Sequence, residues 1–194
     1  MNRAVSLLAF FVMAIPAMAM AQPPSLTSLT PTNGSPLGGT TVVLTGTDFT
    51  ASDAVTFDAI AATSVTFDSA TQLTVTTPAH AAGAVDVVVS NGNGSSTLVG
   101  GFTYDAPPVL TSLAPTNGTP LGGTSVVLTG TGFTAGDAVT FDGLAATVTF
   151  DSATQLTVTT PAHAAGAVDV IVSNGNGSST LVGGFTYDAP PVLS

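Results

Sequence analysis

Cysteine is absent from the 194-residue sequence, and so is tryptophan. Without cysteine the chain has no disulfide to stabilise a small fold, so each domain depends on a buried apolar core. The same absence excludes thiol catalysis and zinc sites with cysteine ligands. It also excludes the lipid-modified cysteine that anchors bacterial lipoproteins.

Basic side chains are almost absent as well. Arg3 is the single Lys or Arg, against eleven carboxylates, all of them Asp. Nucleic acids are bound largely through Lys and Arg contacts to phosphate, and anionic membrane surfaces attract basic segments. The composition therefore argues against nucleic acid and membrane surfaces as partners. Beyond Arg3, a protonated histidine is the only side-chain cation that an ion pair can use.

A long apolar run occurs only at the N-terminus. A short start containing Arg3 precedes an apolar stretch from Ala4 to Ile15, and the segment closes on Ala19-Met20-Ala21. This pattern is typical of a secretory signal peptide, and the apolar stretch is shorter than the roughly 20 residues of a spanning helix. We therefore expect a signal peptide over residues 1–21 and no membrane insertion after its cleavage. The mature protein is expected to be secreted, and to be extracellular, at the cell surface or periplasmic.

The remaining sequence is a tandem repeat. Residues 65–111 match residues 148–194 at 45 of 47 positions. The two differences are Val88 against Ile171 and Thr111 against Ser194. Such a match at adjacent positions indicates a recent duplication of one structural unit.

Two domains follow from the repeat. The expected boundaries are residues 22–105 for repeat 1 and residues 106–189 for repeat 2. Residues 190–194 reproduce the opening of a repeat, so we interpret them as the start of a truncated third copy.

Within a repeat, apolar residues alternate with polar ones over short runs. Leu73 and Val75 flank Thr74, and Phe102 and Tyr104 lie two positions apart in the last run. Period two is typical of half-buried strands, and turn signals such as Asn-Gly and Gly-Gly separate the runs. About seven short strands per repeat predict an all-β fold, an immunoglobulin-like β-sandwich without helices. Tyr104 and its counterpart Tyr187 are then expected in the core.

The motifs of each repeat resemble the IPT/TIG immunoglobulin-like domain family. Repeat 1 reads PTNGSPLGGTTVVLTGTDF, then VTFD, then LTVTTPAHAAGAVDVVVSNGNGSS and finally GGFTYD, and repeat 2 keeps the same order. The resemblance covers nearly all of the chain after residue 22 and implies two tandem E-set β-sandwiches. It also implies a spacer or interaction role, as in cell-surface receptors, bacterial adhesins and polysaccharide-processing enzymes. The family's DNA-binding members use basic contacts that this chain lacks.

His80 and His163 are the side chains best suited to proton transfer near neutral pH. Each follows a Thr-Pro-Ala turn, and the alanines around them offer no further metal ligand. We interpret both as exposed turn histidines. A Gly-x-Ser-x-Gly elbow is absent, and the Asp residues fit turns and strand edges rather than a catalytic pair. We therefore predict that the protein is not an enzyme and has no catalytic, cofactor-binding or metal site and no cofactor.

Calcium and carbohydrate remain alternatives as ligands. Ca²⁺ could use Asp105 at the domain junction, but the sequence has no Asp-x-Asp-x-Asp run of local oxygen ligands. Carbohydrate sites commonly present exposed aromatic side chains, whereas both tyrosines here are expected in the core. Neither ligand is therefore the leading prediction.

The leading expectation is a non-enzymatic secreted or cell-surface module that acts in spacing, adhesion or surface assembly. The short linker Asp105-Ala106-Pro107-Pro108 predicts a semi-rigid joint between the repeats. Its partner would be a protein or polysaccharide at a cell surface, or another copy of itself. One alternative is a polysaccharide-binding accessory module. Another is a self-assembling filament subunit that uses residues 190–194 as a donor strand.

Overall fold

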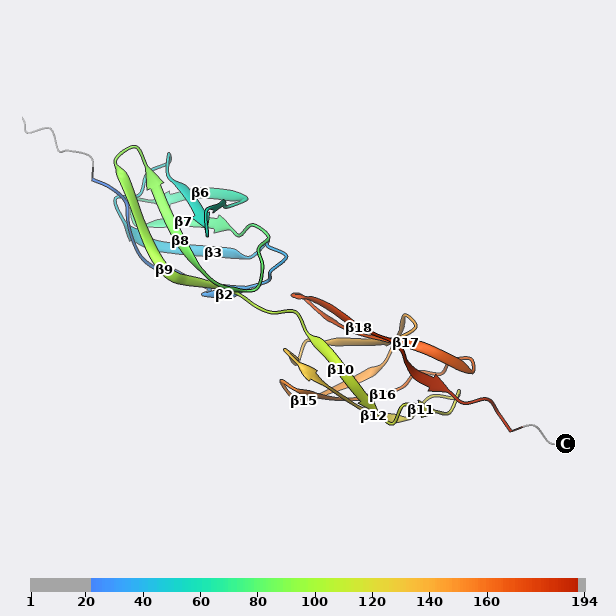
Figure 1. The fold of residues 1–194 in the computed structure, drawn as a ribbon. Coiled ribbons are helices and arrows are strands. Elements are labelled where there is room, and N and C mark those ends of the chain that lie inside the picture. Colours follow the sequence, from blue (N-terminus) through green and yellow to red (C-terminus); the bar gives the residue numbers. More distant parts are fainter. Residues whose placement is uncertain (1–21, 192–194) are drawn as a thin grey trace, which may run out of the picture.

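The computed structural model describes residues 22–191 and shows two β-sandwiches in succession, with no helix in that range. The expected signal peptide and the last residues of the truncated third copy, 192–194, lie outside the described residues. The molecule is elongated, and the two ends of the described chain lie at its opposite ends (Figure 1). The described part contains no helix that could span a membrane.

Each repeat contains nine strands in the described range. Repeat 1 has β1 (Ser25–Thr30), β2 (Asn33–Gly34), β3 (Thr41–Thr47), β4 (Ala54–Phe57), β5 (Ile60–Ala61), β6 (Ser64–Ser69), β7 (Gln72–Thr76), β8 (Gly83–Asn91) and β9 (Gly94–Tyr104). Repeat 2 has β10 (Val109–Ala114), β11 (Asn117–Gly118), β12 (Ser125–Thr131), β13 (Ala138–Phe141), β14 (Leu144–Ala145), β15 (Thr147–Ser152), β16 (Gln155–Thr159), β17 (Gly166–Asn174) and β18 (Gly177–Tyr187). The two-residue strands account for the excess over the seven expected, because they are too short to show a period.

The strands of each repeat form two sheets. In repeat 1 the four-stranded sheet has the order β1-β3-β7-β6, and the five-stranded sheet has the order β2-β9-β8-β4-β5. Repeat 2 reproduces both, as β10-β12-β16-β15 and β11-β18-β17-β13-β14. Neighbouring strands are antiparallel except that β2 runs parallel to β9, and β11 parallel to β18. Strands β6 and β15 each form a free edge of a four-stranded sheet.

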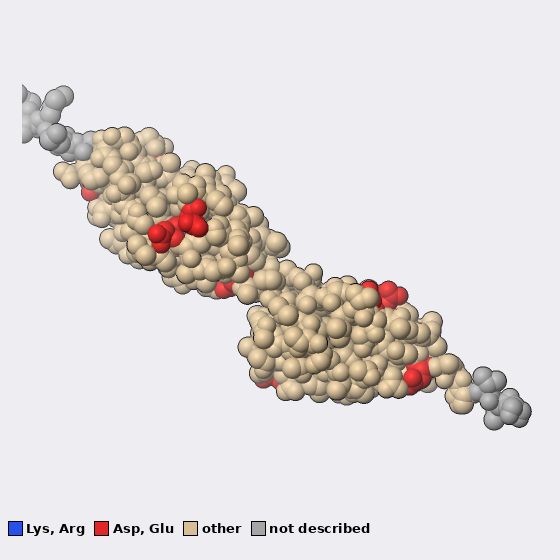
Figure 2. Space-filling model, viewed as in Figure 1, with Lys and Arg blue, Asp and Glu red and all other residues tan. Residues whose placement is uncertain are grey.

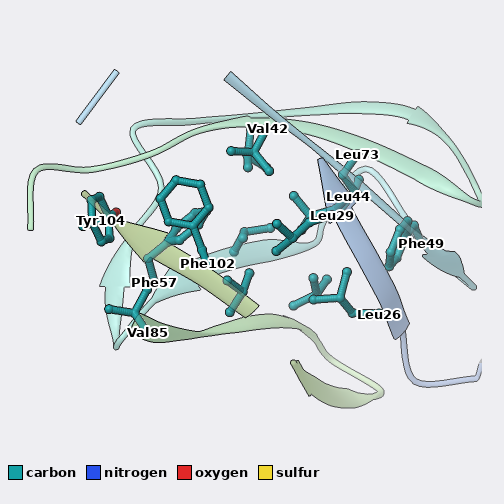
Figure 3. Packing of buried hydrophobic residues seen from close by; sticks show 14 residues of the cluster. Leu26, Leu29, Val42, Leu44, Phe49, Phe57, Leu73, Val85, Phe102 and Tyr104 are labelled. Carbon is teal, nitrogen blue, oxygen red and sulfur yellow. The ribbon is translucent and has the colours of Figure 1, made fainter. Parts of the chain in front are cut away.

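The core lies between the two sheets of each repeat. Leu73 and Val75 on β7 are fully buried, as their alternation with threonine predicts. Aromatic side chains gather at one end of the core around Tyr104, whereas Phe49 closes the other end (Figure 3). Tyr104 and its counterpart Tyr187 are each 1% exposed, which confirms their predicted place in the core.

The difference between Val88 in repeat 1 and Ile171 in repeat 2 lies outside the core. Val88 on β8 pairs with Thr56 and Thr97 on its neighbours and is half-buried, whereas Val87 and Val89 are fully buried. The additional methylene of Ile171 in repeat 2 therefore projects from the outer face of the sheet, where a volume change costs little.

Candidate functional site at the ends of the repeats

The two ends of each sandwich carry different loops. The C-terminal pole is the end of each sandwich at which its last strand finishes. In repeat 1 this pole holds residues 35–39 and 77–82 and Asp105. The opposite end is the N-terminal pole, which in repeat 2 holds residues 132–137 and 174–177. Since the linker runs from Asp105 to Pro108, it joins the C-terminal pole of repeat 1 to the N-terminal pole of repeat 2 (Figure 1).

His80 lies in a cluster with Asp58 and Tyr104 at the C-terminal pole. Its ring stacks on Tyr104 with the centroids 5.0 Å apart, and its Nε2 lies 3.5 Å from Asp58 Oδ2. His163 repeats this arrangement with Tyr187 and Asp142 at 5.1 Å and 3.3 Å. The prediction of exposed turn histidines is therefore wrong, because the two side chains are only 17% and 19% exposed.

The hydrogen bonds of His80 hold the loops of the pole together. Ring atom Nδ1 lies 2.8 Å from the carbonyl oxygen of Ala81, which can only accept, so Nδ1 carries a proton in this contact. On the other side of the ring, Nε2 faces Asp58 Oδ2, and this contact becomes an ion pair when the imidazole is protonated. The backbone N–H of His80 also donates to the carbonyl of Pro36 at 2.9 Å. The cluster thus joins three loops of the pole.

The same cluster lacks the parts of a hydrolytic site. In hydrolases a histidine held by a carboxylate activates a neighbouring hydroxyl or thiol. Among residues 22–191, no serine or threonine hydroxyl hydrogen-bonds to the ring of His80 or His163. The geometry therefore supports a structural role for the two histidines.

Burial raises the pKa of Tyr104 and of Tyr187 above the ordinary value of 10.0, chiefly through desolvation, with hydrogen bonds to Thr77 and Thr160 opposing the shift. The folded protein therefore keeps protons that the unfolded chain releases. This contribution to stability is complete at pH values below the tyrosine pKa of the unfolded chain. It is lost as the pH rises through the tyrosine pKa of the folded protein.

We therefore expect the free energy of unfolding to fall as the pH rises above about 10. The sequence has no Lys or Cys and a single Arg, Arg3, whose guanidinium keeps its charge throughout this range, so these two phenols dominate the alkaline titration of side chains. Urea unfolding at several pH values between 8 and 11 measures the slope. Combining Tyr104→Phe with Tyr187→Phe should flatten it, and an unchanged slope in the double variant would assign the pH dependence to other groups.

The junction between the repeats is a polar contact. Ser35 Oγ donates to the carbonyl oxygen of Gly175 at 2.6 Å, which joins the two poles directly. Asn33 Nδ2 donates to Asp105 Oδ2 at 2.9 Å, which holds the start of the linker against repeat 1. A cleft of about 390 Å³ lies beside these bonds and is lined by Asn33, Asp105, Ala106, Gly132, Phe133, Thr134 and Asn176.

Calcium gains little support at this junction. Asp105 is the one carboxylate among the residues that line the cleft, and one of its oxygens already accepts from Asn33. Three or more His, Cys, Asp or Glu side chains do not gather as a metal site anywhere in residues 22–191. Hard cations usually take several oxygen ligands from a compact segment of chain.

Two buried carboxylates at the N-terminal poles escaped the sequence-based analysis. Asp53 accepts from the backbone N–H and the hydroxyl of Thr50 at 3.1 and 2.6 Å, and from Asn91 Nδ2 at 2.8 Å. Asp137 makes the corresponding bonds with the Thr134 hydroxyl and Asn174 in repeat 2. The signal was present as the Thr-x-x-Asp spacing, in which the Asp carboxylate accepts from the threonine three residues earlier. Each carboxylate stabilises the loops of its own N-terminal pole, and in repeat 2 that pole meets the junction.

The surface is mostly uncharged, with small separate groups of Asp (Figure 2). Threonine and serine cover the outer face of the four-stranded sheet, as in the exposed Thr41, Thr45 and Thr66. Phe67 and Phe150, each 42% exposed, are the exposed aromatic side chains of the described residues, one in each repeat. The aromatic cluster that a carbohydrate site commonly presents is therefore missing from the described surface.

Comparison with known proteins identifies the family to which the two repeats are similar. The model of the IPT/TIG domain family matches residues 24–104 and 108–187. Fibrocystin-L of Mus musculus is 31% identical over 170 residues, which span 84% of this chain and 4% of the mouse protein.

Solved structures are similar to this chain at lower identity. The full extracellular region of plexin A4, domains 1 to 10, has a TM-score of 0.50 at 21% identity and covers 90% of this chain and 16% of its own. SGBP-B from a complex xyloglucan utilization locus in Bacteroides uniformis has a TM-score of 0.40 at 20% identity, covering 84% and 49%. This chain thus spans less than two thirds of each of these relatives.

The family match covers both repeats, and each repeat is the all-β sandwich that the motifs imply. Immunoglobulin-like domains of this type are typically non-catalytic interaction modules. The chain belongs to the IPT/TIG domain family and contains two of its domains in tandem.

Proposed function

We propose that the chain is a secreted, semi-rigid spacer that holds two TIG domains end to end at a cell surface. The observation that carries this proposal is the direct contact between the poles, in which Ser35 of repeat 1 donates to the Gly175 carbonyl of repeat 2. A flexible tether would need no such contact, whereas a spacer of defined length depends on one.

The linker supports the same role. The backbone N–H of Asp105 donates to the carbonyl of Gly34 at 2.8 Å, and its side chain accepts from Asn33. The two prolines that follow each fix φ near −65°, so few linker torsions remain free. Pro107 also lies beside Gly177 at the N-terminal pole of repeat 2. Contacts at both ends and stiff residues between them favour one relative orientation of the repeats.

The partner is proposed to be a protein or polysaccharide at the cell surface, met through the uncharged threonine and serine faces. The polysaccharide-binding alternative has weaker support, because Phe67 and Phe150 are single exposed aromatics on separate repeats. The donor-strand alternative depends on residues 190–194, of which the last three lie outside the described residues.

Small-angle X-ray scattering on the chain from Gln22 tests the spacer. We expect an elongated particle with a maximum dimension of about 70 Å, since each strand of about seven residues spans roughly 23 Å and loops add to both domains. Replacing Pro107 and Pro108 with glycine should broaden the distribution of interdomain distances, because glycine restores backbone freedom.

The matched control replaces Pro23 and Pro24, the equivalent prolines at the outer end of repeat 1, with glycine. This control should leave the scattering profile unchanged. A wild-type chain as flexible as the linker variant would reject the spacer of defined length.

A further inference from the structure

Strand β6 has free backbone hydrogen-bonding groups along its outer edge. The N–H of Thr77, next to β7, donates to the carbonyl of Thr40, next to β3. This bond identifies which residues of β7 direct their backbone N–H and C=O groups toward β3. Because bonds alternate in antiparallel pairs, Thr66 on β6 bonds to β7. The N–H and C=O groups of Val65 and Phe67 consequently point away from the sheet.

Apolar side chains accompany these free groups. Val65 is 38% exposed and Phe67 42%, although both face the interior side of their sheet. Ile60, on the corresponding edge of the opposite sheet, is 45% exposed. The opposite sheet ends there in the two-residue strand β5, which is too short to cover β6. The sandwich is therefore open along this side.

The usual protection of an edge strand is weak here. Natural edges commonly carry lysine, proline or an unpaired charge that prevents strand addition. Strand β6 has one charge, Asp68, and its Oδ2 accepts from Thr74 Oγ1 at 2.6 Å on the outer face of the sheet. A bulge follows Phe67, so the regular edge extends over residues 64–67.

We propose that β6 pairs with the β6 strand of a second copy of this chain, antiparallel and centred on Thr66. In this register Val65 lies opposite Phe67 of the other copy, and each of these residues directs its N–H and C=O across the interface. Two symmetric Val–Phe contacts cover the exposed apolar atoms on one face. On the other face the two Asp68 side chains lie at opposite ends of the paired segment, beyond the bulge that follows Phe67, so the two carboxylates stay apart.

The sequence of β6 is thus complementary to itself in an antiparallel pair, and β15 repeats the pattern except that Val148 is half-buried against the core. Phe150 on β15 is also 42% exposed. The N–H of Thr160 donates to the carbonyl of Thr124, so the backbone hydrogen bonds of this sheet alternate as they do in repeat 1. Thr149 then occupies the central position. Each chain therefore offers two pairing edges, which suits side-by-side association of several copies. This association is independent of the proposed spacer, whose dimensions are measured on dilute monomer.

Disulfide trapping tests the register in a chain that has no cysteine of its own. Directly opposite residues in a non-hydrogen-bonded antiparallel pair have Cα atoms about 4.5 Å apart, within the range of about 4.4–6.8 Å for disulfides. Thr66→Cys and Thr149→Cys, alone and mixed, should form covalent dimers at least about tenfold faster than Thr41→Cys. Thr41 is the control because it is exposed on the interior strand β3. Equal rates for all three variants would overturn the proposal.

Sedimentation equilibrium on the chain from Gln22 in about 0.15 M salt tests the pairing without a cross-link. Val65→Pro, with the same change at Val148, removes an outward N–H but no bond to β7, so folding should persist. Phe67→Thr with Phe150→Thr removes the apolar contacts instead. Each pair of changes should weaken dimerisation by about tenfold or more.

The matched control is Val99→Thr with Val182→Thr, since both valines are 80% exposed but lie on β9 and β18. It should leave the dimerisation constant unchanged. A wild-type chain that stays monomeric at every concentration, or a control as weak as the Phe67 variant, would show that these edges do not pair.

Discussion

Phe57→Ala is expected to destabilise repeat 1 by about 3–5 kcal/mol. Phe57 is fully buried and meets Phe102 and Tyr104 edge to face, with ring centroids 5.4 and 6.4 Å apart. Alanine would remove both aromatic contacts and leave a cavity at the aromatic end of the core. Since whole domains are stable by only about 5–15 kcal/mol, the loss is a large fraction of the total.

The duplication supplies the internal control for this experiment. Phe141 occupies the same place in repeat 2, where its ring centroid lies 5.2 Å from that of Phe185. Urea unfolding of Phe57→Ala should separate into two transitions, with an early one for repeat 1 and an unchanged one for repeat 2. Phe141→Ala should reverse the assignment. If both transitions move together in either variant, the repeats unfold as one unit, and the destabilisation cannot be assigned to one core.

Gly46→Ala is expected to destabilise repeat 1 by about 3 kcal/mol, at the upper end of overpacking changes, or by more. Gly46 lies in β3 opposite Leu26 of β1. A Cβ at this position would overlap the carbonyl oxygen of Ser25 and lie 2.5 Å from Phe49 Cζ. The Ser25 atom belongs to the backbone, so a side-chain rotation cannot relieve the overlap and β1 has to move.

Gly92→Ala is the matched control, because a Cβ at Gly92 meets nothing within 4 Å. Thermal unfolding should show a decrease of about 10–20 °C in the Tm of repeat 1 for Gly46→Ala and almost none for the control. A small decrease for Gly46→Ala would mean that β1 is free to shift. The corresponding glycine of repeat 2, Gly130, would have the same overlap with Val109, so its variant should affect the other transition.

The sequence predicts the fold well because its information is local and repeated. Period-two runs such as that around Thr74 identify strands and their buried faces, and the core positions of Tyr104 and Tyr187 are confirmed. The strands β2 and β5 were missed, since two residues cannot show a period. The number of strands was therefore underestimated while the architecture was correct.

The features of the poles could not be derived in the same way. The environment of His80 depends on Asp58 and Tyr104, which are distant in sequence and meet through the pairing of β4, β8 and β9. The local sequence is a Thr-Pro-Ala turn surrounded by alanines, which gives no sign of either partner. The Ser35 to Gly175 bond likewise joins two loops from different repeats, and a linker sequence predicts stiffness but no such contact.

The open edge shows a further limit of sequence patterns. Phe67 alternates with polar residues as core residues do, yet it is 42% exposed. Its exposure follows from the short length of β5 in the opposite sheet, which the pattern of β6 does not record. The direction of its backbone groups follows from the hydrogen-bond phase between β3 and β7. Both properties belong to the assembled sandwich.

The parallel pair of β2 and β9 has a mechanical consequence for a rod of this kind. Thr103 N–H donates to the Thr32 carbonyl at 2.9 Å, and Asp105 N–H donates to the Gly34 carbonyl at 2.8 Å. Tension along the molecule pulls β2 from its N-terminal end and β9 from its C-terminal end, so the two strands slide against each other. Both bonds then carry the load in shear and have to break together, whereas a hairpin pulled open from one end breaks its bonds one at a time. The short β2 strand therefore secures the last strand of the domain at the pole where tension leaves it.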